Sequence, residues 1–179
     1  MNRIHYYVLT IFLIISFNAK SQNTTAVDAG DILILALPVA SLTSTFIIGD
    51  AKGRWQFTKG FLLSGGVTFG IKMLVDKSRP DKSNKNSFPS GHTSISFHSA
   101  AFIHHRYGIT YAIPAYALAS FTGLTRIYGE KHDGFDVLIG AVIGIGSAYL
   151  FTSPYQQEHM QLTFSSDNEN YLMGFRFKF

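Results

Sequence analysis

The sequence contains no cysteine, which excludes disulfide bonds and thiolate metal sites and leaves the redox compartment open. Charged residues are also scarce, at 15% of 179 residues, whereas apolar residues reach 46% and aromatic residues 15%. This balance excludes a disordered chain and is typical of membrane proteins or heavily buried helical proteins. The net charge of +4 comes from a few loops and forms no basic stripe, which argues against nucleic acid as a partner. The length predicts one domain.

The N-terminal segment, residues 1–21, is predicted to be a secretory signal peptide. Arg3 precedes an apolar run over residues 6–17, and small residues stand before Gln22 at the two positions that determine cleavage. The run is shorter than the ~20 residues that a transmembrane helix needs. A retained first transmembrane helix is the alternative, and both interpretations send the chain into the export pathway.

The body of the chain, residues 22–155, is predicted to contain five helices. They are expected over residues 32–48, 57–75, 93–105, 109–124 and 137–151. Four of these segments are apolar, with glycine or other small residues at helix-packing intervals. The third is shorter and more polar, which favours a soluble bundle as the alternative. We expect an all-α, membrane-embedded helical bundle of about five helices.

The tail, residues 156–179, has a different sequence period. Five residues, Tyr171, Met173, Phe175, Phe177 and Phe179, alternate with their neighbours in the two-residue period of a β-strand. Residues 161–164 are able to pair with this strand across the turn-forming residues 165–168. The tail is therefore predicted to be a C-terminal β-hairpin.

Three polar clusters stand at the ends of the predicted helices. The first contains Lys72 and Arg79, the second Ser90, Gly91 and His92, and the third Arg126, His132 and Asp136. If consecutive helices run antiparallel, all three clusters lie at the same end of the bundle. We therefore expect one polar site there.

His132 and Asp136 are the candidates for nucleophilic chemistry. A spacing of four predicts that both lie on one helix face, where the carboxylate accepts the proton of one imidazole nitrogen. The other nitrogen is then unprotonated and nucleophilic. The alternative is a His–Asp pair that only caps a helix.

His92 follows Pro89, Ser90 and Gly91 at an expected helix N-terminus. Free backbone N–H groups and the positive end of the helix dipole attract an anion there. An imidazole beside that anion is placed to protonate a leaving alkoxide. An ordinary helix cap is again the alternative.

Lys72, Arg79 and Arg126 supply positive charge for a phosphate. Arginine binds phosphate oxygens through two parallel hydrogen bonds, whereas lysine acts as a point charge. Lys72 ends an apolar helix, where an unpaired cation is costly unless an anion binds. These cations suit an oxyanion and repel a metal ion, so no metal and no cofactor is predicted.

In chain order the clusters read Lys-x6-Arg-Pro, Pro-Ser-Gly-His and Arg-x5-His-x3-Asp. The chain thus resembles the bacterial lipid phosphatase branch of the type 2 phosphatidic acid phosphatase and vanadium-dependent haloperoxidase superfamily, although Thr125 stands where that family has serine. The resemblance implies that His132 is the nucleophile and forms a phosphohistidine, that Asp136 orients it, and that His92 is the general acid and later the base. It also implies five phosphate ligands, namely Lys72, Arg79, Ser90, Gly91 and Arg126.

The expected function is hydrolysis of a lipid phosphomonoester or pyrophosphate. We expect an enzyme of the bacterial inner membrane whose active site faces the periplasm, because an exported N-terminal end places all three clusters on the outer side. One alternative is a soluble periplasmic non-specific acid phosphatase. A vanadium haloperoxidase and a non-catalytic membrane protein are the others.

Overall fold

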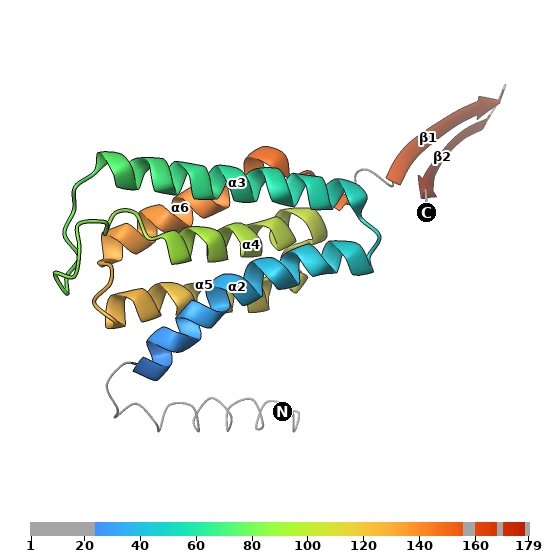
Figure 1. Cartoon of the computed structure of the whole chain (residues 1–179). Coiled ribbons are helices and arrows are strands. Elements are labelled where there is room, and N and C mark those ends of the chain that lie inside the picture. Colours follow the sequence, from blue (N-terminus) through green and yellow to red (C-terminus); the bar gives the residue numbers. More distant parts are fainter. Residues whose placement is uncertain (1–23, 156–159, 168–169, 178–179) are drawn as a thin grey trace, which may run out of the picture.

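The computed structural model describes residues 24–155, 160–167 and 170–177. The described residues form five helices, α2 (Thr24–Ile47), α3 (Ala51–Leu74), α4 (Gly91–Tyr107), α5 (Ile109–Tyr128) and α6 (Gly134–Phe151), and two strands, β1 (Met160–Asp167) and β2 (Asn170–Phe177) (Figure 1). The predicted bundle of five helices is confirmed. The predicted signal segment, residues 1–21, lies outside the described residues.

Capping side chains, and not the apolar pattern, determine where two helices start. The Asp133 side chain accepts a hydrogen bond from the backbone of Asp136, and the Asp136 side chain accepts one from the backbone of Asp133. This capping box starts α6 at Gly134, before the predicted start at residue 137. Ser90 is the N-cap of α4, and its side chain accepts a hydrogen bond from the Thr93 backbone N–H.

Helix α4 lies in the centre of the bundle and contacts the other four helices (Figure 1). Its fully buried side chains include Ser94, Ser96 and His98. The Ser94 hydroxyl shares hydrogen bonds with Ser64, at 2.7 Å, and with Thr68, at 2.9 Å, both on α3. The polar segment that favoured a soluble bundle is therefore the core of this fold, where small polar groups join the helices.

Two glycines let α6 approach the backbone of α4. A Cβ atom on Gly140 would lie 2.5 Å from the carbonyl oxygen of Ser90, and one on Gly144 would overlap the carbonyl oxygen of Ser94. Because of this close contact, the first turn of α6 lies beside the first turn of α4. The Ser90 N–H donates to the Asp136 carbonyl oxygen at 3.0 Å.

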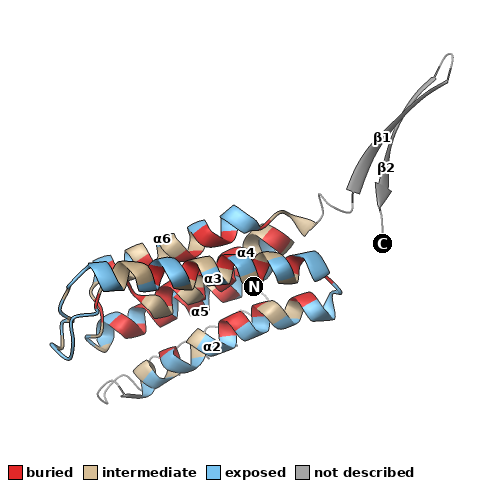
Figure 2. Cartoon of the chain, turned by 45° about the horizontal axis from the view of Figure 1, so that its top comes forward, coloured by how far each residue is buried: buried red, intermediate tan, exposed pale blue. Residues whose placement is uncertain are grey.

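Figure 2 shows exposed positions along all five helices, and many of the exposed residues have large apolar side chains. Examples are Leu35 on α2, Leu62 on α3 and Leu150 on α6, which are exposed by 69%, 67% and 73%. Among the residues that the structure describes, two helices, over Thr25–Ile47 and Gly134–Phe151, are long and apolar enough to span a membrane. Only 28% of each apolar window is buried, which is low for the core helix of a soluble protein.

At the end of the bundle where α4 finishes, Arg106 and Asp50 form a buried ion pair. Two guanidinium nitrogens, Nε and Nη2, each donate to the Asp50 carboxylate at 2.7 Å. Asp50 also accepts from the Gly53 N–H and from the Tyr107 hydroxyl. This network fixes the start of α3 against the end of α4 and leaves the opposite end for the polar clusters.

The two strands pair antiparallel, with Met160 opposite Phe177 and Asp167 opposite Asn170.

Candidate active site

The alternating helix directions bring the three polar clusters to one end of the bundle (Figure 1). Helices α3 and α5 end there, whereas α4 and α6 begin there. The loop from α3 to α4 and the loop from α5 to α6 therefore lie at the same end. The structure thus places the predicted site residues together, as the antiparallel arrangement required.

The geometry of His132 and Asp136 differs from the prediction. His132 precedes the cap of α6, so the two residues do not share a helix face. The Asp136 carboxylate accepts hydrogen bonds from the Ser87 hydroxyl, from Lys77 Nζ at 2.7 Å and from the Asp133 N–H at 3.1 Å. Its Oδ2 lies 3.6 Å from His132 Nδ1, which is an ion-pair distance and too long for a hydrogen bond.

His132 is held in a buried and positively charged environment. Its side chain is 3% exposed, and Nδ1 is among the buried polar atoms without a hydrogen-bond partner in the described part of the chain. Burial, with the charges of Lys72 and Arg79, lowers the pKa of His132 to about 4, against opposing effects of Ser87 and Asp136. The imidazole is therefore neutral near pH 7, and that is its nucleophilic form.

The two cations of the first cluster lie close enough to act on His132 electrostatically. Lys72 Nζ donates to the carbonyl oxygen of Asn86 at 2.8 Å. The backbone N–H of Arg79 donates to the carbonyl oxygen of Asn84 at 2.9 Å. Within residues 24–155, Arg79 Nε is buried without a hydrogen-bond partner. A buried donor without a partner is costly in the free protein.

Arg126 lies in the last turn of α5 and is fixed from two sides. Its Nη2 donates to the Val27 carbonyl oxygen at 2.7 Å, and its Nη1 donates to Asp31 Oδ1 at 2.7 Å, both on α2. Thr125, which replaces the serine of the family motif, accepts from Nε and Nη2 at 3.3 Å. The threonine hydroxyl therefore helps to orient the guanidinium.

The second cluster forms the N-terminus of α4. Ser90 is fully buried, its hydroxyl lies 2.9 Å from that of Thr93, and its N–H is bonded to Asp136. Helix geometry leaves the N–H groups of Gly91 and His92 without intrahelical acceptors. Ser90 is therefore part of the buried support of the site. The backbone N–H groups of Gly91 and His92 are the donors that this helix end offers to a ligand.

Four residues of the site, Asp31, Lys77, Ser87 and Asp133, were not found by sequence reasoning. Asp31 carries the clearest signal, because a carboxylate at the start of an apolar helix is costly unless it is paired. Lys77 is indistinguishable by sequence from the solvated lysines of its loop. Its contacts with Asp133, at 2.6 Å, and with Asp136 are formed in the tertiary structure and leave no signal in the sequence.

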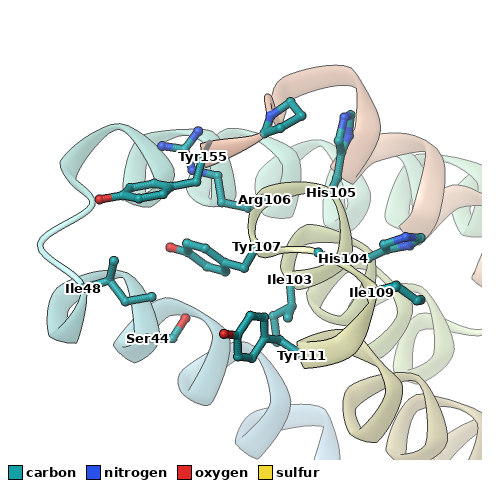
Figure 3. A pocket seen from close by; sticks show the side chains of 12 residues that line it. Ser44, Ile48, Ile103, His104, His105, Arg106, Tyr107, Ile109, Tyr111 and Tyr155 are labelled. Carbon is teal, nitrogen blue, oxygen red and sulfur yellow. The ribbon is translucent and has the colours of Figure 1, made fainter. Parts of the chain in front are cut away.

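A cavity of about 710 Å³ lies at the opposite end of the bundle, around the end of α4 (Figure 3). Its lining includes Arg106, Tyr107, Tyr111 and Tyr155 and contains none of the predicted site residues. Arg106 in its wall is engaged by Asp50. The cavity is therefore separate from the candidate active site.

Comparison with known proteins agrees with this geometry. The model of the PAP2 superfamily matches residues 76–159. A lipid A 4'-phosphatase of Helicobacter pylori is 32% identical over 167 residues, which cover 84% of each chain. A lipid A 1-phosphatase of Porphyromonas gingivalis is 42% identical over 89 residues, which cover 48% of this chain and 20% of that protein. The crystal structure of Aquifex aeolicus LpxE shares the fold, with a TM-score of 0.64 at 22% identity over 79% of this chain and 92% of that chain.

The helical bundle gathers two histidines and several cations at one end. Together with the phosphatases to which the chain is similar, this arrangement identifies the protein as a phosphatase. The chain belongs to the PAP2 superfamily, in its bacterial lipid phosphatase branch. The resemblance drawn from the three sequence motifs is confirmed.

Proposed function

We propose that this protein is a membrane-embedded lipid A phosphatase that acts through a phosphohistidine. The observation that carries this proposal is His132, a buried neutral imidazole beside the positive charges of Lys72 and Arg79. A neutral imidazole attacks phosphorus, and the cations bind the phosphate oxygens. The named relatives act on lipid A, which supplies the substrate class.

The reaction has two steps. In the first, His132 Nε2 attacks phosphorus while the bond from phosphorus to the sugar oxygen breaks and His92 gives that oxygen a proton. Asp136 faces Nδ1 of His132 and stabilises the positive charge that forms on the ring. The distance of 3.6 Å shortens to a hydrogen bond in the complex, as catalytic contacts often do.

In the second step water replaces the histidine on phosphorus. His92, which is now neutral, takes a proton from the water, and the bond from phosphorus to Nε2 of His132 breaks. Inorganic phosphate leaves and both imidazoles return to their starting states. Lys72, Arg79, Arg126 and the amides of Gly91 and His92 bind the phosphate oxygens in both steps.

The experiment that tests this function measures phosphate release from a substrate panel. Purified full-length protein in detergent is given lipid A that carries both phosphates, the two single-phosphate forms, phosphatidic acid and undecaprenyl pyrophosphate. We expect release from lipid A, with mass spectrometry of the product identifying the 1- or the 4'-position. Efficient hydrolysis of soluble phosphate esters, with none of lipid A, would instead support a non-specific acid phosphatase.

The exposed apolar faces support embedding in the membrane. Leu35, Leu62 and Leu150 point outward on three different helices, and a lipid environment removes the cost of exposing them to water. In the proposed orientation the site faces the periplasm. Lys52, near the opposite end of the bundle, is then on the cytoplasmic side, as the positive-inside tendency prefers.

The C-terminal strands have no catalytic part in this proposal. Every predicted site residue precedes the middle of α6, whereas β1 starts at Met160. We assign the predicted β-hairpin to packing on the bundle or on a partner protein.

Activity is expected to need no divalent metal and to be inhibited by vanadate in competition with substrate. Within the described residues, no three histidine or acidic side chains converge on a point where they could hold a metal ion. Asp136 is already bonded to Lys77 and Ser87. Five-coordinate vanadate resembles phosphate under in-line attack, so a site that is complementary to the transition state binds it tightly.

The measurement is turnover after treatment with a chelator, followed by vanadate titration at several substrate concentrations. Activity that disappears with the chelator and returns with one added metal would contradict the metal-free mechanism. Inhibition by vanadate that is not competitive would contradict the proposed phosphate position.

The acid limb of the profile of kcat/KM against pH is expected near pH 4. Protonated His132 cannot attack phosphorus, so activity falls as pH drops through the pKa of about 4 and not through the ordinary 6.5. Lys72→Met removes a charge that lowers this pKa, so the limb moves to higher pH. Lys82→Met, in the exposed loop, is the matched control on the same substrate. An acid limb that stays in place in Lys72→Met would contradict the assignment.

A further inference from the structure

One carboxylate of the site has no part in the mechanism above. Asp31 lies on α2, outside the three motifs and outside the residues that match the family model. Its Oδ1 lies 2.8 Å from His92 Nε2 and 2.7 Å from Arg126 Nη1. A single oxygen atom therefore joins the proposed general acid to a proposed phosphate ligand.

The packing of α2 against α5 brings Asp31 to this position. A Cβ atom on Gly30 would overlap Thr125 Oγ1 and would lie 2.7 Å from Arg126 Nη2, so only glycine allows the helices to come this close. One turn earlier, the Val27 carbonyl oxygen accepts from Arg126 at 2.7 Å. Asp31 is thus held by helix packing.

Asp31 also balances the charge around His92. The imidazole faces Asp31 from α2, Arg126 from α5 and Arg79 from the loop before α4. Burial and the charge of Arg126 lower the pKa of His92, Arg79 acts in the same direction, and Asp31 opposes them. A general acid has to be protonated when the leaving oxygen departs, so a carboxylate that stabilises the imidazolium favours the first step.

We propose that Asp31 is a positioning residue for His92. This proposal rests on the proposed phosphatase function. The carboxylate accepts a hydrogen bond from Nε2–H of His92, which fixes the orientation of the ring and keeps one proton on Nε2. Nδ1 then exchanges the catalytic proton. It gives the proton to the leaving oxygen as the bond to phosphorus breaks, and it takes a proton from water in the second step.

A purely structural role predicts different behaviour. The Asp31 side chain is 50% exposed, and an exposed ion pair between two helices contributes little to stability. If Asp31 only joined α2 to α5, its loss would affect all substrates equally and would leave the pH profile in place. If it only held Arg126 for phosphate binding, its loss would raise KM.

The test uses Asp31→Asn in the full-length protein, because asparagine still accepts a hydrogen bond but carries no charge. We expect kcat on an alkyl phosphate to fall about ten- to a hundredfold, which is less than the roughly 10²–10⁴-fold that general acid–base catalysis supplies in full, because His92 itself remains. On an aryl phosphate, whose leaving group needs no proton, the loss is expected to be much smaller. KM is not raised, and the alkaline limb of the pH profile moves to lower pH. Asp28→Asn, which changes an exposed carboxylate on the same helix, is the matched control.

A double mutant tests whether Asp31 acts through His92. In the His92→Ala background, Asp31→Asn is expected to cause no further loss on the alkyl phosphate, because the group that it positions is already gone. Additive losses would overturn the proposal. So would equal losses on alkyl and aryl phosphates, a raised KM with normal kcat, or an unshifted alkaline limb.

These outcomes separate the inference from the function on which it rests. A wild-type protein that is inactive on every phosphate ester would overturn both. An active wild type whose Asp31→Asn variant matches Asp28→Asn on both substrates would overturn only the role of Asp31.

Discussion

His132→Ala is expected to lower turnover on lipid A by a factor on the order of 10⁴ or more, because no other group replaces the nucleophile. The fold is expected to survive. The His132 backbone N–H donates to the Arg126 carbonyl oxygen at 3.1 Å, and alanine keeps that hydrogen bond. The measurement is kcat, with circular dichroism and gel filtration in detergent to show that the helical bundle remains assembled.

His105→Ala is the matched control, since this histidine lines the cavity at the opposite end of the bundle. Trapping gives a second measurement. Wild-type protein that is denatured in alkali during turnover of radiolabelled lipid is expected to retain phosphate on His132, and His132→Ala to retain none. Near-normal activity of His132→Ala, or label on another residue, would show that the nucleophile has been wrongly assigned.

Arg126→Ala is expected to reduce kcat/KM by about 10²–10³-fold, because a fixed donor to the transition state is lost. Arg126→Lys is expected to recover only part of the loss. Lysine keeps the charge but cannot bond the Val27 carbonyl oxygen, Thr125 and a phosphate in one planar arrangement. The affinity for vanadate is expected to fall in parallel with kcat/KM.

Stability has to be measured alongside activity for Arg126, since the side chain is only 4% exposed. Its removal takes away the hydrogen bond between the charged guanidinium and the Val27 carbonyl oxygen, at a cost of about 1.5–3 kcal/mol. Added guanidinium separates the two effects, because it restores activity only if the protein is folded and the vacated position faces the substrate. A folded Arg126→Ala variant with unchanged kcat/KM would exclude Arg126 from the phosphate site.

The sequence alone was sufficient to predict a bundle of five helices and the end of the bundle at which the candidate site residues lie. Long apolar segments separated by polar loops predict helices, because a helix satisfies the backbone hydrogen bonds of its own segment, as a segment in lipid has to do. Consecutive antiparallel helices then place alternate loops at the same end. For this reason the positions of Lys72, His92 and His132 along the chain were enough to predict that they meet.

Predictions from the sequence were less reliable where local hydrogen bonds decide the position at which a helix begins and the direction of a side chain. His132 and Asp136 were expected on one helix face, yet Asp133 caps α6 between them and leaves His132 outside the helix. Ser90 was expected to bind phosphate, which stays a prediction, and the structure adds that it caps α4 and donates its N–H to the Asp136 carbonyl oxygen. Spacing does not distinguish a cap from a ligand, because both use the same small polar side chains.

The polar helix α4 shows a second limit of sequence reasoning. Its serines and His98 favoured a soluble protein, because polar residues usually face water. In this bundle they face inward, and apolar side chains cover the outer faces. Hydropathy reports how polar a segment is, but only the packing of its neighbours decides which way its polar side chains point.

The sequence by itself determined the helices, the order of the motifs and their meeting at one end, since these follow from periodicity and chain direction. Only the tertiary structure decided which groups surround each catalytic candidate. Asp31 is 61 residues from His92 and 95 from Arg126 along the chain, and no local pattern connects them. Their contact exists because Gly30 allows α2 to approach α5, and that fit depends on the shapes of two helix surfaces.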